Sequence, residues 1–535
     1  MNQEILQFCL KKGILIDKQI SNLLDESINI SAIKNLIERV DFQYNQKIIS
    51  KSFFDNNPDK VYELLSNYNG DNRKFLETFF LNLGINIEIF EKNELSLPEI
   101  QIDIKNKVES SINLLRIYKN NPKKIEVGDF VKNFKSRFIA IKNILQDRVE
   151  LENLVSINRI ESNKQCSLIA MVYDKKVTKN DNVLLEIEDM TGRVTALINK
   201  NRFELYEKSK EILLDEVIGL KVSGSREMIF VNDIIFPDAR LLEKKKSKNN
   251  EIAAFISDTH VGSDKFLEKN FLKFIHWLNG EIGDENQRNE ALKVKYLFIT
   301  GDTVDGVGVY PGQENQLLIK DVNEQYKKLS ELLQMIRKDI MIIMCAGQHD
   351  AVRVAEPQPI IGEYYGESLH DISNLYLVTN PALVEIGDVK FKVLMYHGAS
   401  MHGVINSIEA LRVGRAHDHP TQVVKYLLKK RHLAPTHSLV TYTPLDNEDA
   451  LLISEIPDIV STGDLHRPEI SEYNGILLFA GSCWQSITPF EEKVGNNPDP
   501  CKVPIFNLKT REMKILDFSE IEEDKKEGGE NENRS

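Results

Sequence analysis

The sequence predicts a multidomain protein in which an α/β sandwich fills the C-terminal half, preceded by a small β-barrel and an N-terminal helical module. Three patterns predict it. Apolar runs alternate with helical segments over residues 251–518, strand-like runs crowd into residues 151–240, and residues 1–92 show helical periodicity. With 535 residues, 41% of them hydrophobic, the chain is long enough to bury several cores.

The first 92 residues are expected to form a small helical module. Ile33, Leu36, Ile37 and Val40 recur at the i, i+3, i+4, i+7 spacing of one helix face. No group of catalytic residue types accompanies them, so a packing or docking role is favoured.

Residues 93–150 are expected to form a linker and a helix. The stretch 93–127 is polar, contains Pro98 and Pro122, and suggests a linker with a short helix. An apolar stripe follows, whose helical spacing and mixed-charge surroundings indicate core packing rather than a stacking platform for bases. The stripe consists of Phe130, Phe134, Phe138, Ile141 and Leu145.

Between residues 151 and 240 the apolar period becomes two. Val183, Leu185 and Ile187 alternate with polar residues, a turn follows at residues 189–192, and the alternation then resumes. About five short strands in this length fit a small barrel such as an OB-fold, which can bind single-stranded nucleic acid. Because aromatic and basic residues are sparse here, a structural or subunit-contact role is favoured.

Two charged segments flank the α/β region. Residues 243–250 form a lysine-rich linker that is expected to be solvated, with a phosphate contact as the alternative. Residues 519–535 are charged and rich in Gly and Asn, and they are expected to be disordered.

The composition restricts the class of protein. A net charge of −13 argues against a chain coated by nucleic acid, but it leaves room for a local DNA site. The five cysteines form no CxxC motif, which fits a reducing cytoplasm and gives no support to a disulfide or zinc framework. No apolar run reaches the length of a membrane span, about 18 residues, so a soluble cytoplasmic protein is expected.

Histidine is unevenly distributed. All 11 histidines lie between His260 and His466. Histidine is the commonest metal ligand and acid–base residue, so this segment is where chemistry is expected.

Five strand-like runs in that segment each end in a polar motif. In chain order the motifs are Asp258-Thr259-His260, Gly301-Asp302, Gly347-Gln348-His349-Asp350, Tyr396-His397-Gly398 and Gly463-Asp464-Leu465-His466. Open α/β sheets bind ligands at the carboxyl ends of their strands. One such motif alone is more often a turn or a cap, but five in order within one α/β region predict a shared site.

The residue types at these ends suit a pair of divalent ions. Two ions about 3.5–4 Å apart need one shared anionic ligand and several separate nitrogen or oxygen ligands. Neighbouring parallel strands can supply such a set, whereas a single loop cannot. Mixed His, carboxylate and amide ligands suit Mn²⁺, Zn²⁺ or Fe²⁺ better than an all-oxygen Mg²⁺ site.

The motif order DxH, GDxxD, G(N)HD, H, G(H)xH resembles the calcineurin-like metallophosphoesterases over about residues 251–490. Narrower stretches resemble the small subunits of archaeal family D DNA polymerases. They are residues 305–311, 348–353 with 355–359, 430–435 and 462–467, together with Trp484-Gln485. A helical module and an OB-fold ahead of the phosphoesterase also match that family. The resemblance implies a four-layer α/β/β/α sandwich.

The resemblance also implies residue roles. Asp258, His260 and His466 would hold one metal ion, Asp302 would bridge to a second, and His397 would hold the second with Gln348 and Asp464. His349 would lie beside the substrate phosphate as proton donor or transition-state stabiliser, so His349 and Asp302 are the predicted catalytic residues.

Two positions depart from the superfamily pattern. Gln348 stands where Asn is usual, and Asp464 stands where His is usual. Both residue types can still ligate, and the carboxylate favours harder ions such as Mn²⁺ or Mg²⁺. An active site is therefore expected rather than a decayed one.

Basic residues near the motifs are candidates for binding substrate phosphates. They are Arg353, Arg467, Lys430 and Arg431. The alternative is that they balance the acidic site or pair with carboxylates.

The resemblance implies a metal-dependent 3′–5′ exonuclease that acts on terminal phosphodiesters of single-stranded or mismatched DNA. It would proofread in a nucleoid-associated heterodimeric replicative DNA polymerase, with two divalent ions, Mn²⁺ foremost, as cofactors. Polymerisation would belong to a large catalytic partner subunit. A catalytically silent scaffold subunit and a stand-alone phosphoesterase are the alternatives.

Overall fold

The computed structural model describes residues 3–17, 20–21, 30–44, 47–55, 61, 64, 76, 79–80, 112–118, 124–162, 164–445, 448–494 and 496–519. The chain divides into two compact units, Met1–Glu109 and Ser110–Ser535. Apart from Ser519, the segment 519–535 that was predicted to be disordered lies outside the described residues.

The N-terminal unit contains helices α1 (Gln3–Lys12), α3 (Ile30–Tyr44) and α4 (Lys51–Asp55). Strand β1 (Leu15–Ile16) pairs in parallel with β2 (Ile48–Ile49). The apolar stripe predicted from residue 33 to residue 40 lies on α3 and is buried in the core of this unit.

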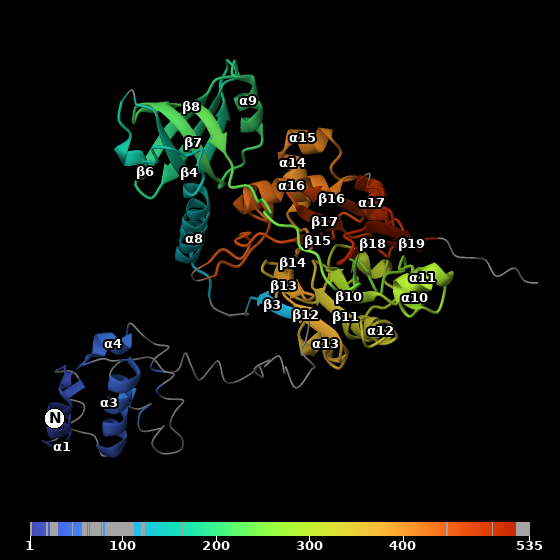
Figure 1. Ribbon diagram of the computed structural model, residues 1–535, viewed down its shortest axis with the longest axis horizontal. Helices are drawn as coiled ribbons and strands as arrows, with labels where there is room; N and C mark the ends of the chain where they lie inside the picture. The colour runs from blue at the N-terminus through green and yellow to red at the C-terminus, as the bar shows by residue number, and fades with distance from the viewer. Residues whose placement is uncertain are drawn as a thin grey trace, which may run out of the picture. The chain divides into compact units, whose positions relative to one another are not determined.

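Part of the predicted linker is instead a strand. Residues 112–116 form β3 (Ile112–Arg116), which pairs antiparallel with β13 (Ala382–Ile386) at the edge of a sheet (Figure 1). Only Ile112 of this strand is buried, so its sequence lacks the alternation that marks a half-buried strand. Pairing with a strand far along the chain fixes its conformation.

Helix α8 (Val127–Gln146) carries the second predicted stripe. Phe138, Ile141 and Leu145 are buried against residues of the barrel, which confirms core packing over base stacking. The same helix also reaches the sandwich, because Arg137 Nε lies 2.7 Å from Asp449 Oδ2 in a buried ion pair.

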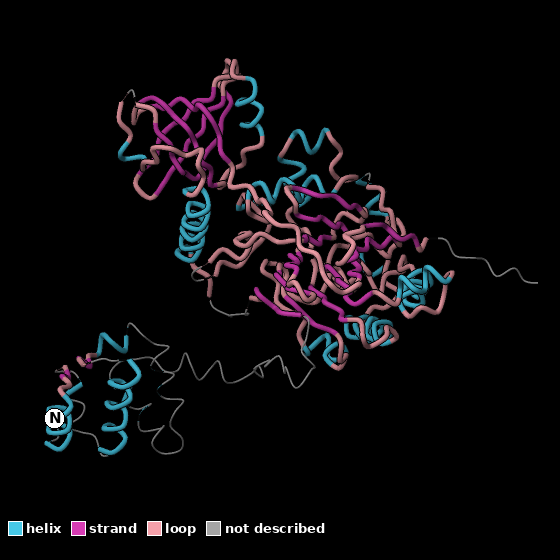
Figure 2. The backbone as a smooth tube through the Cα atoms, in the orientation of Figure 1, coloured by secondary structure: helices cyan, strands magenta, loops and turns pink. Residues whose placement is uncertain are grey.

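The barrel is closed and has five strands in the order β4-β5-β6-β8-β7 (Figure 2). The strands are β4 (Cys166–Val177), β5 (Val183–Asp189), β6 (Gly192–Ile198), β7 (Val217–Gly224) and β8 (Met228–Ile235), with α9 (Phe203–Lys210) between β6 and β7. The residues predicted to alternate, such as Val183, Leu185 and Ile187, fill its interior.

Two six-stranded sheets form the centre of the sandwich in the second unit. The first has the order β12-β11-β10-β9-β18-β19, with β9 (Ile252–Ile256), β10 (Val294–Thr300), β11 (Met341–Cys345), β12 (Leu375–Val378), β18 (Lys502–Asn507) and β19 (Met513–Asp517). The second has the order β16-β17-β15-β14-β13-β3, with β14 (Phe391–Met395), β15 (Ile459–Thr462), β16 (Glu469–Tyr473) and β17 (Ile476–Ala480).

The two sheets share one apolar layer. Phe255 of β9 stacks on Phe479 of β17 with ring centroids 4.3 Å apart, within a cluster that draws residues from both sheets. The outer face of the first sheet packs on helices α10 (Glu268–Leu278) and α12 (Val322–Gln334). The outer face of the second packs on α14 (Met401–Ser407) and α16 (Pro420–Lys430). The multidomain α/β architecture with a closed barrel is therefore as predicted.

Shorter helices complete this unit. They are α11 (Glu285–Ala291), α13 (Glu363–His370), α15 (Glu409–Val413), α17 (Pro489–Val494) and the 3₁₀ turns η1 (Ile157–Arg159), η2 (Gln313–Asn315) and η3 (His437–Leu439).

Candidate metal centre

All five predicted strands are present, and the polar residues that follow them converge. β9, β10 and β11 are parallel neighbours in one sheet, and β14 and β15 are parallel neighbours in the other. The hydroxyl groups of Thr300 and Ser461 lie 2.8 Å apart and join the end of β10 to β15 of the other sheet. The side chains after these strands therefore meet at one edge of the sandwich.

Several of the predicted ligand residues adopt a left-handed backbone conformation. The φ angle is 52° at Asp258, 46° at His260, 48° at Asp302, 69° at Asp464 and 55° at His466. This region is uncommon for residues other than Gly, and each such residue costs about 1–3 kcal/mol that the surrounding structure must offset. Strain of this kind is concentrated at functional sites.

Gly301 and Gly347 are required because other residues of the centre lie very close to their Cα atoms. A Cβ atom at Gly301 would collide with the ring of His397, and one at Gly347 would collide with the carboxylate of Asp302. The loops after β10 and β11 can therefore approach the neighbouring motifs this closely only because glycine stands at these two positions.

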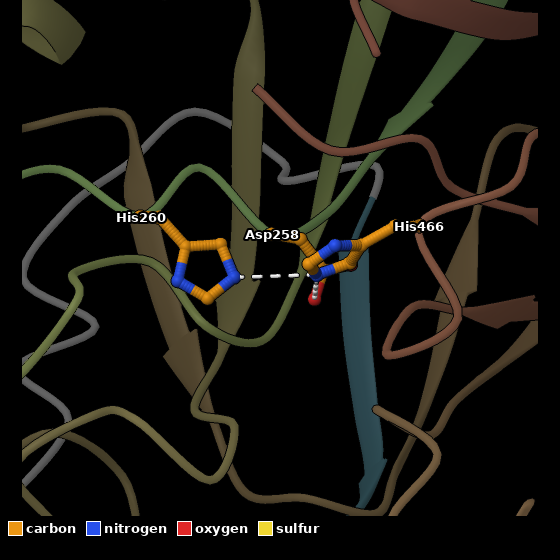
Figure 3. A group of neighbouring side chains, drawn as sticks. All are labelled: Asp258, His260 and His466. Carbon is orange, nitrogen blue, oxygen red and sulfur yellow. Dashed lines mark hydrogen bonds and ion pairs between the residues drawn. The ribbon is translucent and has the colours of Figure 1, made fainter. Parts of the chain in front are cut away.

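The first ligand cluster contains Asp258, His260 and His466 (Figure 3). His466 Nε2 lies 3.4 Å from Asp258 Oδ1 and 3.3 Å from His260 Nε2. Three ligand atoms from two loops of different sheets thus surround one point.

Asp302 belongs to two further groups of ligand atoms. It lies with His260 and His349 in one group, and with Asp258 and His397 in another, each within 4.8 Å. His397 Nε2 is 3.3 Å from Asp302 Oδ1. The Asp302 carboxylate is shared by neighbouring ligand groups, and a ligand that bridges two metal ions must lie in such a position.

Gln348 and Asp464 lie beside His397. Gln348 Nε2 donates to Asp464 Oδ1 at 3.0 Å, and His397 Nε2 is 3.8 Å from the same oxygen. The amide nitrogen of Gln348 therefore faces the cluster, and the amide would have to turn for its oxygen to ligate a cation.

Three histidines are held through Nδ1 and present Nε2 to the centre. The Nδ1 partners are Asp305 Oδ1 at 3.0 Å for His260, Glu491 Oε1 at 2.7 Å for His466, and the Thr300 carbonyl at 3.0 Å for His397. Ionised carboxylate and carbonyl oxygens only accept, so each Nδ1 carries a proton and each neutral ring has a lone pair at Nε2. This is the tautomer that ligates metals.

The donor set fits a divalent cation. The Nε2 atoms of His260 and His466 face each other at 3.3 Å, which is unfavourable for two lone pairs unless a proton or a cation lies between them. Among the described residues, His397 Nε2 and Asp464 Oδ2 are buried atoms without a hydrogen-bond partner. Each such atom costs about 1–3 kcal/mol, which a coordinated cation would remove.

The charges of the centre support the same conclusion. Burial raises the pKa of Asp302, but His397 and His349 hold it well below its ordinary value. Burial lowers the pKa of His397, but Asp302 raises it well above the ordinary value. Burial and the nearby Asp258 raise the pKa of Asp464. Bound cations would satisfy these carboxylates without the added protons.

A cleft of about 690 Å³ opens above these residues. The residues that line it include His260, Asp302, Gln348, His349, Asp464 and His466, together with Arg467, Tyr310 and residues of α14 and α15. His349 is oriented within it by a 2.8 Å contact between its Nδ1 and the Asp305 carbonyl.

The structure contradicts a substrate role for Lys430 and Arg431. Lys430 Nζ lies 2.8 Å from Glu216 Oε2, with side chains only 1% and 3% exposed, and it joins α16 to the barrel. Arg431 is buried and donates to the carbonyls of Ile453 and Ser454, each at 2.6 Å. Burial and internal partners keep both groups from solvent, so neither can reach a phosphate.

The other two predicted basic residues differ from each other. Arg353 lies outside the cleft lining, and its guanidinium donates to the carbonyls of Ala355 and Pro357. Arg467 does line the cleft, as a residue that binds substrate must.

The sequence did not reveal several residues of the centre. Asp305 was visible in the GDxxD motif, but its contact with His260 was not. No sequence pattern indicated that Glu491 contacts His466, because Glu491 lies on α17, outside every motif. Arg412 and Arg415 of the cleft lining follow no strand end and carry no motif.

No helix in the described parts of the chain is long and apolar enough to cross a lipid bilayer.

Comparisons with known proteins agree with the polymerase-subunit resemblance. Residues 253–471 match the family model of the B subunits of DNA polymerases alpha and epsilon. The DNA polymerase II small subunit of Methanothermobacter thermautotrophicus is 38% identical over 395 residues, which cover 74% of this chain and 80% of that protein. The Pyrococcus abyssi protein of the same name is 36% identical, covering 74% and 64%, and the Archaeoglobus fulgidus protein is 38% identical, covering 71% and 75%.

Among solved structures, an archaeal phosphodiesterase aligns with 50% of this chain and 98% of its own, at 17% identity and a TM-score of 0.25. That likeness is too slight to bear on the fold. The relatives of known name decide the family, because one of them is matched at 38% identity over four fifths of its length. The chain therefore belongs to the family of DNA polymerase II small subunits.

Proposed function

We propose that this chain is a metal-dependent 3′–5′ exonuclease that proofreads DNA for a two-subunit polymerase, and that its sandwich is a calcineurin-like phosphoesterase domain. One observation carries the proposal. Three histidines, each held through Nδ1, direct Nε2 toward the carboxylates of Asp258 and Asp302, and Asp302 lines an open cleft. Such pre-organisation supports an active centre over a silent scaffold.

The residues that would hold two divalent ions fall into two sets. Asp258, His260 and His466 would hold one, His397 and Asp464 would hold the other, and Asp302 would bridge them. When bound, the ions would supply Lewis acidity at the phosphate and make a water molecule more acidic. A mixed nitrogen and carboxylate set favours Mn²⁺.

His349 would act at the phosphate. Its Nδ1 donates to the Asp305 carbonyl, so Nε2 can donate a hydrogen bond only when the ring is protonated. In that form Nε2 would stabilise charge on a phosphate oxygen or pass its proton to the leaving 3′ oxygen.

The family implies a large polymerase subunit and DNA as partners. The chain carries a net charge of −13, and DNA binding gains much of its strength from Lys and Arg on phosphates. The large subunit would therefore supply most of the DNA-binding surface and keep the 3′ end near the cleft.

The test is a nuclease assay on a 5′-labelled single strand with Mn²⁺, with and without the large subunit. The parent chain should shorten the strand from its 3′ end, and Asp302→Asn should not. Asp339→Asn is the matched control, because Asp339 is 53% exposed and precedes β11 at the end of that strand opposite the ligand motif. A parent protein that binds Mn²⁺ but leaves the 3′ end intact, alone and with the large subunit, would refute the exonuclease.

A further inference from the structure

We propose that Arg412 and Arg415, from α15 and the residues after it, and Arg467, from the loop after β15, bind backbone phosphates of the DNA strand next to the phosphodiester that is cut. We call these three residues the arginine rim. The inference rests on the proposed function and adds a strand-binding subsite to it.

The chain places the arginine rim directly beside the ligand cluster. After His397, α14 and α15 contribute residues to the cleft lining, and His402 at the start of α14 approaches Asp464, with Nε2 3.6 Å from Oδ2. Arg412 lies on α15 and Arg415 follows it, and both line the same cleft as His349. In Figure 1, α14 and α15 lie on the side of the sandwich that also carries α17.

The charge of the rim is not fully neutralised by its protein partners. Arg412 Nη1 donates to the Asn406 carbonyl at 2.7 Å, and Arg467 Nη1 donates to the Asn497 carbonyl at 3.0 Å. A carbonyl orients a guanidinium but carries no charge to balance it. Arg415 pairs with Asp418 at 2.8 Å, yet its side chain is 80% exposed, where an ion pair is weak.

This distinguishes the rim from the basic residues that only join parts of the fold. Lys430 is buried against Glu216, and Lys429 is paired with Glu211. In a chain of net charge −13, three arginines that line the same cleft as the acidic ligands are positioned to compensate the repulsion between those ligands and a polyanion.

The shape of the site favours a strand over a small phosphate ester. The arginines come from two separate segments that line one open cleft, whereas one phosphate would need only a single small pocket. Tyr310 also lines the cleft, with its ring 6.3 Å from that of His349, and offers a surface on which a base can stack. Guanidinium groups for phosphates and aromatic rings for bases are how proteins hold single strands.

The test separates strand binding from chemistry. The variants are the double substitution Arg412→Ala/Arg415→Ala and the single substitution Arg467→Ala in the full chain. The matched control is Lys327→Ala/Lys338→Ala, which removes two exposed positive charges from α12 and the turn after it. Anisotropy of a fluorescent oligothymidylate in EDTA, over a series of salt concentrations, measures binding without hydrolysis.

The double variant should weaken oligothymidylate binding about tenfold and flatten the slope of log K against log salt by about 1.4, the value for two lost contacts to a single strand. KM for the strand should rise with kcat nearly unchanged. Hydrolysis of bis(p-nitrophenyl) phosphate, which has no neighbouring phosphate, should also be unchanged. Arg467→Ala should also weaken oligothymidylate binding, with about half the change in slope.

Unchanged affinity and salt slope in both variants would overturn the proposal even if the chain is an active nuclease. A variant that no longer binds the large subunit but keeps its affinity for DNA would also overturn it, because the rim would then bind a protein. If the parent chain cleaves neither substrate, the proposed function fails, while the EDTA binding data still decide whether the rim holds DNA.

Discussion

Asp305→Asn tests how the centre orients its ligands. The Asp305 carboxylate is buried and faces three donors: His260 Nδ1 at 3.0 Å, Gln313 Nε2 at 3.0 Å and Gln485 Nε2 at 3.3 Å. An asparagine has the same shape but replaces one acceptor oxygen with a donor. One of the three donors must then face another donor, and the neutral amide oxygen accepts the hydrogen bond from His260 Nδ1 more weakly than a carboxylate does.

The size of the effect follows from those contacts. Loss of a carboxylate behind a ligating histidine typically lowers metal affinity by about 10–100-fold, or about 1.4–2.7 kcal/mol. The fold should lose a comparable amount, about 1.5–3 kcal/mol, because the lost hydrogen bond involves a charged acceptor. Of the two ions, the one held by His260 should be weakened and the other should be nearly unaffected.

The assay is calorimetric titration of Mn²⁺ into the metal-free chain, beside a denaturant curve for each protein. Asp339→Asn serves again as the exposed control. A variant that binds both ions with parental affinity would show that Asp305 does not support a metal ligand, whatever its nuclease rate. Loss of both ions together would mean that the two sites are not separable through His260.

Four other predictions concern the centre and its support. Asp302→Asn should abolish nuclease activity with little change in the unfolding midpoint, since an amide cannot neutralise two cations; parental activity in Mn²⁺ would exclude Asp302 as the bridge. His349→Ala should retain metal but lose about 10²–10⁴-fold in rate, and a parallel fall in metal content, measured by elemental analysis, would make His349 a ligand instead. The isolated chain should bind single-stranded DNA weakly and cut it slowly compared with the complex at one fixed salt concentration; equal affinity and rate would make this subunit self-sufficient. Asp449→Asn should destabilise the chain by about 3–5 kcal/mol in denaturant, because it leaves the buried Arg137 unpaired. Burial raises the pKa of Asp449, but Arg137 and His432 lower it below the ordinary value, so its contribution is present above about pH 3.9 and is lost as the pH falls further. The difference between parent and variant should therefore shrink in acid, and a difference that grows below that pH would contradict the pairing.

The sequence could reveal the predicted metal ligands because each of them follows a strand. The end of an apolar run marks the end of such a strand. Asp258, His260, Asp302, His397 and His466 were found in this way, and they fall into overlapping groups whose ligand atoms lie within 4.8 Å of one another. Their metal-binding roles stay a prediction.

The residues around the ligands were harder to predict, because their contacts join distant parts of the chain. Lys430 and Arg431 stand near a motif, yet Lys430 pairs with Glu216, 214 residues earlier, and no pattern signals such a pairing. Glu491 contacts His466 from a short helix 25 residues later. Strand β3 was missed for the same reason, since its partner β13 lies far along the chain and only pairing makes it a strand.

The left-handed backbone at the strand ends also restricts which sequences this centre can accept. Apart from Gly, the residues that tolerate such φ angles best are Asn, Asp and His, and two of these are also common metal ligands. At Asp464, where φ is 69°, an exchange between His and Asp therefore changes the ligand without changing the backbone cost. Exchange among these few residue types is therefore the change of side chain that the backbone accepts most readily. Most other side chains would add a conformational cost at this position.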